Sequence, residues 1–169
     1  CFIGERNFKN FLKNYLPNQP GKIGNIETNE VVGDHVGLMY YTIGQRRGLE
    51  VGGTADRLFV VGKNLQDNIL YVALGEDNPY LYSDSCIIDT VNFNCEERPL
   101  ECSAKFRYRA NDYPVTLEYL DNGEIKVKYD AVKSVTPGQA CVFYDGEKCL
   151  GGGIVKTVCK DDKKLWYIL

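Results

Sequence analysis

Two adjacent arginines in a glycine-bounded tip are the first residues of this chain that could do chemistry. The tip, Gly44–Gly48, carries Gln45, Arg46 and Arg47 and follows an expected strand over Leu38–Ile43. Glycine adopts backbone angles that a Cβ forbids, so such a tip can turn tightly and lie close to a partner. Two guanidinium groups offer fork-shaped donors that suit phosphate. The simpler interpretation is a solvated turn, because loops often carry polar residues without a special function.

A second basic group alternates with aromatic residues later in the chain. Residues 105–109 read Lys-Phe-Arg-Tyr-Arg. On a strand, the three basic side chains, including Arg107, would share one face, and Phe106 and Tyr108 would share the other. This pattern predicts a stripe that follows phosphates with an aromatic ring beside it, as in RNA-binding proteins. An ordinary half-buried strand with a basic outer face is the alternative.

Three further features suggest binding, catalysis or close packing. Gln139 follows the turn Pro137-Gly138 at the start of an expected strand, where its amide can bond a base edge or a phosphate. His35 has no carboxylate or serine partner in the sequence pattern, and we interpret it as structural. A strand and no Lys-Ser/Thr pair follows Gly151–Gly153, which favours close packing at a barrel corner over a phosphate loop.

Cysteine spacing separates one thiol from the others. The seven cysteines are Cys1, Cys86, Cys95, Cys102, Cys141, Cys149 and Cys159. None forms a close Cys-x-x-Cys pair, so no metal site is expected. Several lie in apolar strand patterns, where a cysteine is a small buried hydrophobe in a reducing cytoplasm. Cys1 lies outside any strand pattern and is the exception.

Composition limits the kinds of partner. The formal net charge of −3 argues against indiscriminate binding to nucleic acid, so any contact with an anion must come from a local patch. No apolar run reaches the roughly 20 residues that cross a bilayer, and no signal-peptide pattern opens the chain. We therefore expect a cytoplasmic protein without a membrane partner.

One helix and many short strands must position these residues. Apolar residues recur at helical spacing over Arg6–Leu16 and predict the one clear helix. Lys22–Val32 reads as a hairpin, and Leu58–Val61 and Ile69–Ala73 read as a pair of strands. The polar, glycine- and proline-marked segment Gly75–Pro79 is the best domain boundary.

The boundary divides the chain into domains over residues 1–78 and 79–169. Evenly spaced strands are expected in the second domain at Cys86–Phe93, Leu100–Tyr108, Val115–Leu120, Ile125–Tyr129, Ala140–Tyr144, Cys149–Thr157 and Leu165–Ile168. Tight-turn signals lie between them, and short antiparallel strands of this regularity favour a small closed barrel. The predicted fold class is mainly β with one N-terminal helix: a small α+β domain followed by an antiparallel β-barrel.

Several segments resemble the bacterial tRNA-specific 2-thiouridylases, in register over essentially the whole chain. They are Cys1–Arg6, Tyr15–Pro17, Gln19–Gly21, His35–Leu38, Tyr41–Leu49, Val135–Gln139 and Cys149–Gly153. The enzymes of this family have an N-terminal ATP-pyrophosphatase domain, a central domain and a C-terminal β-barrel. This chain resembles the last two.

The resemblance implies a chemistry and its participants. ATP, bound by the N-terminal domain, activates the wobble uridine of tRNA as an adenylate, and Cys1 matches the cysteine whose persulfide sulfur displaces AMP. A disulfide with a partner cysteine of the ATP-pyrophosphatase domain helps to expel the sulfur onto the base. The implied partners are tRNA, a sulfur-relay donor protein or cysteine desulfurase, and that N-terminal domain.

The resemblance also assigns binding residues. Arg107, Tyr108 and Gln139 match positions that contact tRNA. The Gln45-Arg46-Arg47 tip matches a signature loop of the central domain, and its RNA contact is inferred from its chemistry. Because nothing in the chain resembles an ATP site, we expect the chain alone not to thiolate tRNA.

Two other readings remain open. Cys1 could be the nucleophile of an N-terminal-nucleophile hydrolase, with its own α-amine as the base. The chain could also be a stand-alone RNA-binding module without catalysis.

Overall fold

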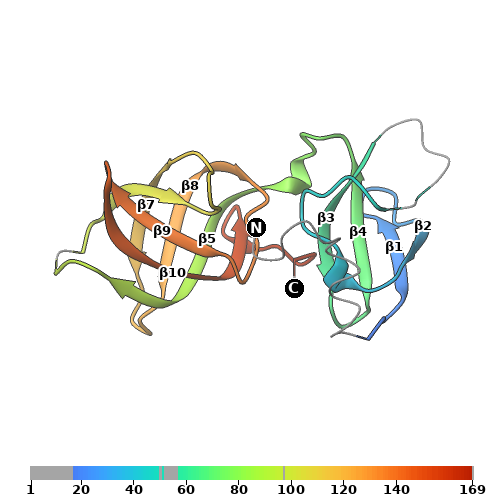
Figure 1. Cartoon of the computed structure of the whole chain (residues 1–169), viewed down its shortest axis with the longest axis horizontal. Coiled ribbons are helices and arrows are strands. Elements are labelled where there is room, and N and C mark those ends of the chain that lie inside the picture. Colours follow the sequence, from blue (N-terminus) through green and yellow to red (C-terminus); the bar gives the residue numbers. More distant parts are fainter. Residues whose placement is uncertain (1–16, 50, 52–56, 97, 169) are drawn as a thin grey trace, which may run out of the picture. The chain divides into compact units, whose positions relative to one another are not determined.

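The computed structural model describes residues 17–49, 51, 57–96 and 98–168. Cys1 and the helix expected over Arg6–Leu16 lie outside the described residues. The chain forms two compact units that divide between Asn78 and Pro79, shown as ribbons in Figure 1.

The first unit contains a four-stranded mixed sheet in the order β2-β1-β4-β3. Its strands are β1 Gly21–Asn25, β2 Val31–His35, β3 Leu58–Asn64 and β4 Ile69–Leu74. The pairs β1–β2 and β3–β4 are antiparallel, which confirms the predicted hairpin and strand pair, and β1 runs parallel to β4. Ile23, Val60, Leu70 and Val72 are fully buried and form the core of this sheet.

The strand expected over Leu38–Ile43 is a wrong prediction. A 3-10 helix, η1, covers Leu38–Tyr40, and the chain then continues without regular structure. The N–H of Tyr40 donates to the carbonyl of Gly37, and that of Tyr41 donates to Leu38. Aromatic residues favour strands because they pack on a pleated surface, but here their burial is achieved by successive tight turns.

The second unit is a closed antiparallel barrel, as predicted. The strands β5 to β10 form one sheet in the order β10-β5-β8-β7-β6-β9, and pairing of β10 with β9 closes it. A short 3-10 helix, η2, precedes β5. The bounds are η2 Pro79–Leu81, β5 Tyr82–Phe93, β6 Glu101–Lys105, β7 Tyr113–Tyr119, β8 Ile125–Lys133, β9 Ala140–Asp145, β10 Lys148–Lys160 and β11 Lys163–Lys164.

Rings and small side chains fill the barrel. Phe93 and Phe143 stack with their centroids 6.1 Å apart, and Phe106 meets Tyr129 edge to face at 4.9 Å. The fully buried Cys86 and Cys141 behave as small apolar residues here, as their strand patterns suggest.

The glycine triplet lies where three strands meet, which confirms the prediction of close packing at a corner. Gly151 pairs with Phe93 on β5 and with Phe143 on β9, so both edges of β10 are occupied at this point. A Cβ on Gly151 or Gly152 would overlap a backbone carbonyl oxygen of β5 or β9, respectively. Only glycine lets the three backbones approach this closely.

Two predicted strands in the barrel are wrong: the first ends early, and the second does not form. The strand expected over Leu100–Tyr108 stops at Lys105, and the chain turns, with the N–H of Ala110 donating to the carbonyl of Arg107 at 3.1 Å. Arg109 lies in the left-handed region at φ 62°, which ends any strand. The segment Leu165–Ile168 is a turn that follows the two-residue strand β11.

Candidate functional site

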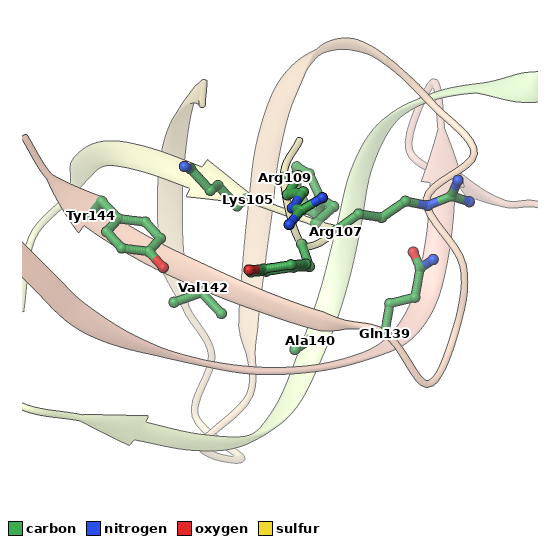
Figure 2. A pocket seen from close by; sticks show the side chains of 9 residues that line it. Lys105, Arg107, Arg109, Gln139, Ala140, Val142 and Tyr144 are labelled. Atoms are coloured by element: carbon green, nitrogen blue, oxygen red, sulfur yellow. The ribbon is translucent and has the colours of Figure 1, made fainter. Parts of the chain in front are cut away.

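An open cleft of about 630 Å³ lies beside the turn after β6 and the start of β9. It brings together three sequence-predicted residues, Arg107, Tyr108 and Gln139, although Gln139 is distant from the others in sequence. Figure 2 shows Gln139 at one end of this cleft and Tyr144 at the other. We call it the barrel cleft.

Arg107 is anchored at one end of its guanidinium group. Its Nη2 donates to the carbonyl of Ser134 at 2.8 Å, in the loop after β8. Partial burial lowers the pKa of Arg107 from its ordinary value, but an arginine stays charged at neutral pH. The anchor therefore presents a positive charge in a defined orientation, which reduces the entropy lost when it binds an anion.

Tyr108 is 86% exposed, which is unusual for a ring of this size. The expected alternation of faces over residues 105–109 does not occur, because the chain turns after Lys105. The guanidinium carbon of Arg109 instead lies 5.3 Å from the centroid of the Tyr108 ring. An exposed ring with a cation beside it is a surface on which a nucleic-acid base can stack.

Gln139 uses one end of its amide to hold its own turn. The N–H of Thr136 donates to Oε1 of Gln139 at 3.1 Å, so Nε2 is the end that can donate outward. Among the described residues, no acceptor for this Nε2 is found. The barrel cleft thus offers N–H donors, which suit a phosphate or a base carbonyl.

Sequence reasoning placed Lys105 in a basic stripe but missed Tyr144, which lines the cleft beside it. Lys105 lies 3.6 Å from the carboxylate of Asp112, and its Nζ lies 5.5 Å from the centroid of the Tyr144 ring. Its charge is therefore partly compensated within the protein. Ser134, which anchors Arg107 but does not line the cleft, was also missed, because a backbone carbonyl that anchors an arginine has no side-chain signature.

The arginine tip belongs to the first unit. Gly44 and Gly48 lie in the left-handed region at φ 85° and 76°, so both positions require the freedom that glycine has. Arg46 and Arg47 are exposed, whereas the amide of Gln45 is engaged at both ends within the loop. All three residues are expected from the sequence to contact RNA. In the structure, the side chain of Gln45 bonds within the loop, and those of Arg46 and Arg47 are exposed to solvent.

The remaining candidates do not form a reactive centre in the described part of the chain. Burial raises the pKa of Cys86 to about 12 and that of Cys102 to about 11, which disfavours their nucleophilic thiolate forms. The six cysteines among the described residues are all free. Cys1 lies outside the described residues.

His35 is buried, and its Nε2 lies 3.0 Å from the carbonyl of Asn68. Burial lowers the pKa of His35, and its ring meets Tyr41 edge to face. These contacts agree with the structural interpretation of this histidine.

The described residues contain no group of three or more His, Cys, Asp or Glu residues that could hold a metal ion. No helix in this part of the chain is long and apolar enough to cross a membrane.

Two family models match consecutive parts of the chain. Residues 9–74 match the tRNA methyl transferase PRC-barrel domain. Residues 83–155 match the aminomethyltransferase beta-barrel domain. The two matches fall on either side of the division between the two units.

Curated relatives are identical to this chain at about half of the aligned positions. The tRNA-specific 2-thiouridylase MnmA of Bacillus subtilis (strain 168) is 53% identical over 173 residues, covering 99% of this chain and 46% of the relative. The tRNA-specific 2-thiouridylase MnmA 2 of Geobacillus kaustophilus (strain HTA426) and the tRNA-specific 2-thiouridylase MnmA of Listeria monocytogenes serovar 1/2a are each 52% identical over 172 residues, with the same coverage. The chain thus spans about half the length of the curated relatives it matches, and it belongs to the family of tRNA-specific 2-thiouridylases.

Proposed function

We propose that this chain is the part of a tRNA 2-thiouridylase that binds tRNA and supplies the sulfur-carrying cysteine. Residues 1–78 and 79–169 form its two domains. In the whole enzyme, persulfide sulfur on Cys1 is transferred to C2 of the wobble uridine after ATP-dependent adenylation. The donor of that sulfur is a relay protein or a cysteine desulfurase, and the reaction takes place in the cytoplasm.

The barrel cleft carries the tRNA-binding part of this proposal. It combines an anchored arginine, a ring that is 86% exposed and an amide donor without a protein acceptor in the described part. A phosphate suits Arg107, and a base suits the face of Tyr108. Gln139 adds a donor for a phosphate oxygen or a base carbonyl.

ATP does not fit the described residues. The glycine triplet is part of β10 and pairs on both edges, so it leads into no helix that could cradle phosphates. We assign the nucleotide to an ATP-pyrophosphatase domain outside this chain, and the six described cysteines have no role in the transfer.

A comparison of the chain with the full-length protein tests this division of labour. Each is incubated with tRNA, ATP and a persulfide donor, and 2-thiouridine is measured in digested tRNA. The full-length protein is expected to form 2-thiouridine, and the chain alone is expected to bind tRNA without modifying it. ATP-dependent 2-thiouridine formation by the chain alone would contradict the proposal.

Replacing Arg107 by alanine is expected to weaken tRNA binding by roughly tenfold, because a charge-assisted hydrogen bond contributes about 1.5 kcal/mol or more. The slope of log affinity against log salt should also fall by about one phosphate contact. Fluorescence titration of labelled tRNA at several salt concentrations measures both quantities.

Arg98→Ala is the matched control, because it removes an arginine of the same barrel that does not line the cleft. Arg98 stacks on Phe93 and Tyr119 instead, and its loss should leave the salt slope unchanged. Equal salt slopes for the Arg107 variant and the unchanged protein would rule out a phosphate contact by Arg107.

A further inference from the structure

The same four-residue turn occurs in each unit. Thr42–Gln45 reads Thr-Ile-Gly-Gln and Thr136–Gln139 reads Thr-Pro-Gly-Gln. The glycine has φ 85° in both, as the third residue of a type II turn requires. The backbone N–H of the glutamine donates to the threonine carbonyl at 3.0 Å in the first unit and 3.2 Å in the second.

The glutamine side chain closes each turn in the same way. The N–H of the threonine donates to Oε1 of the glutamine, at 3.0 Å in the first unit and 3.1 Å in the second. Because a backbone N–H can only donate, it fixes which end of each amide is the oxygen. The amide nitrogen must therefore point away from the turn in both cases.

Each turn is also bonded to a buried valine of a neighbouring strand. In the first unit, Val60 accepts from Gly44 at 2.8 Å and donates to Gln45 at 2.9 Å. In the second unit, Val155 accepts from Gly138 and donates to Gln139, both at 2.8 Å. The two turns thus share one hydrogen-bond pattern and differ in the surroundings of the glutamine Nε2.

The difference lies in what the amide nitrogen reaches. Gln139 lines the barrel cleft, and no described residue accepts from its Nε2. Nε2 of Gln45 donates to the carbonyl of Arg47 at 2.7 Å. The amide of Gln45 therefore bridges the loop from Thr42 to Arg47.

We infer that Gln45 is a positioning residue that holds the backbone of the tip so that Arg46 and Arg47 are presented together to phosphate groups of an RNA backbone. This inference rests on the proposed RNA-binding role of the tip. A tip bounded by Gly44 and Gly48 has much backbone freedom, and binding would have to remove it. The bridge made by Gln45 removes that freedom in advance, which lowers the entropic cost of binding.

Salt dependence separates positioning from direct contact. A neutral side chain releases no counterions, so a glutamine that merely bonded the RNA would change the affinity and not the salt slope. A glutamine that positions two arginines changes both. The turn at Thr136–Gln139 supplies a matched control, because Gln139→Met makes the same chemical change at the last residue of the corresponding turn in the second unit.

The experiment titrates fluorescently labelled tRNA with the full-length protein between about 50 and 200 mM salt. The Arg46→Ala/Arg47→Ala double variant is expected to reduce the salt slope by about 1.4 to 1.8, for two phosphate contacts. Gln45→Met should lower the affinity three- to tenfold and reduce the salt slope toward that of the double arginine variant. Adding Gln45→Met to the double arginine variant should change nothing further. Gln139→Met should lower the affinity at an unchanged slope.

Trypsin supplies a readout that does not depend on RNA. Cleavage after Arg46 or Arg47 requires the tip to open locally, so Gln45→Met should be cut faster at this site. Gln45→Glu is the second variant should Gln45→Met fail to fold. It keeps the acceptor for Thr42 and loses the donor to Arg47, and it should likewise be cut faster.

Three results would overturn the inference, and they can be told apart. A reduced slope in the double arginine variant with an unchanged slope in Gln45→Met would show that the tip binds RNA without help from Gln45. An unchanged affinity and slope in the double arginine variant would remove the RNA-binding role of the tip, and the inference with it. An unchanged rate of tryptic cleavage in both Gln45 variants would show that the tip is not held by this amide.

Discussion

Replacing Cys1 by serine in the full-length protein is expected to reduce 2-thiouridine formation by about a thousandfold or more, to the background level. A thiolate can carry a sulfane sulfur as a persulfide and can later join a disulfide, whereas a serine hydroxyl can do neither. Binding of tRNA should be unchanged, because the barrel cleft and the arginine tip remain. Mass spectrometry of digested tRNA and a binding titration measure the two effects.

Cys149→Ser is the matched control for this prediction. Cys149 is the exposed cysteine among the six described ones, so accessibility alone does not set it apart from a reactive thiol. The control should keep full activity. If instead the Cys1 variant retained activity and the Cys149 variant lost it, the sulfur would travel through the barrel and the proposed role of Cys1 would be wrong.

Replacing Gly152 by alanine is expected to destabilise the barrel by at least about 3 kcal/mol. A Cβ at this position would overlap the carbonyl oxygen of Cys141, which belongs to the backbone of β9 and cannot move without breaking the ladder. In a unit of this size such a loss lowers the melting temperature by more than about 12 °C. Differential scanning calorimetry measures this change.

Gly24→Ala is the control substitution in a strand. A Cβ at Gly24 would meet the side chain of Ile69 at 3.6 Å, which is ordinary van der Waals contact. This change should shift the melting temperature by only a few degrees. Similar melting temperatures for the Gly152 variant and the unchanged protein would mean that β9 and β10 do not pair as closely as the structure has them.

The Gly152→Ala substitution should also weaken tRNA binding, although Gly152 does not line the barrel cleft. Gln139 immediately precedes β9, and Val142 and Tyr144 lie on it. Pairing of β9 with β6 brings these residues beside Arg107, and pairing of β9 with β10 holds β9 in the closed sheet. The cleft is therefore a product of the closed sheet and not of one local segment.

Much of the fold could be predicted because its signals are local. The hairpin after Gly21 and the strand pair β3–β4 have polar turns that are visible in the sequence, and Asn29 and Asn68 take the left-handed angles that such turns need. The alternating strands of the barrel likewise have one buried and one exposed face. Closure of the barrel followed from the number and regularity of these strands.

The wrong predictions share one physical cause. Leu38–Ile43 and the residues after Lys105 contain the aromatic residues that favour strands, but propensity reports only that a side chain fits a half-buried surface. Tyr40 and Tyr41 reach burial through turns, and Tyr108 is left exposed where the chain reverses. Whether a ring joins a sheet depends on partners that lie elsewhere in the chain.

By itself, the sequence determined the family, the barrel and the kinds of residue that could meet tRNA, because motifs, turn signals and alternation are properties of neighbouring residues. Only the tertiary structure decided how those residues are used. Arg107 is oriented by the carbonyl of Ser134, 27 positions away, and Gln139 reaches the same cleft from the start of β9, the strand that pairs with β6. Gln45 and Gln139 look alike in sequence, yet one amide nitrogen holds a loop and the other faces the cleft. Hydrogen-bond partners set these roles, and no spacing along the chain specifies them.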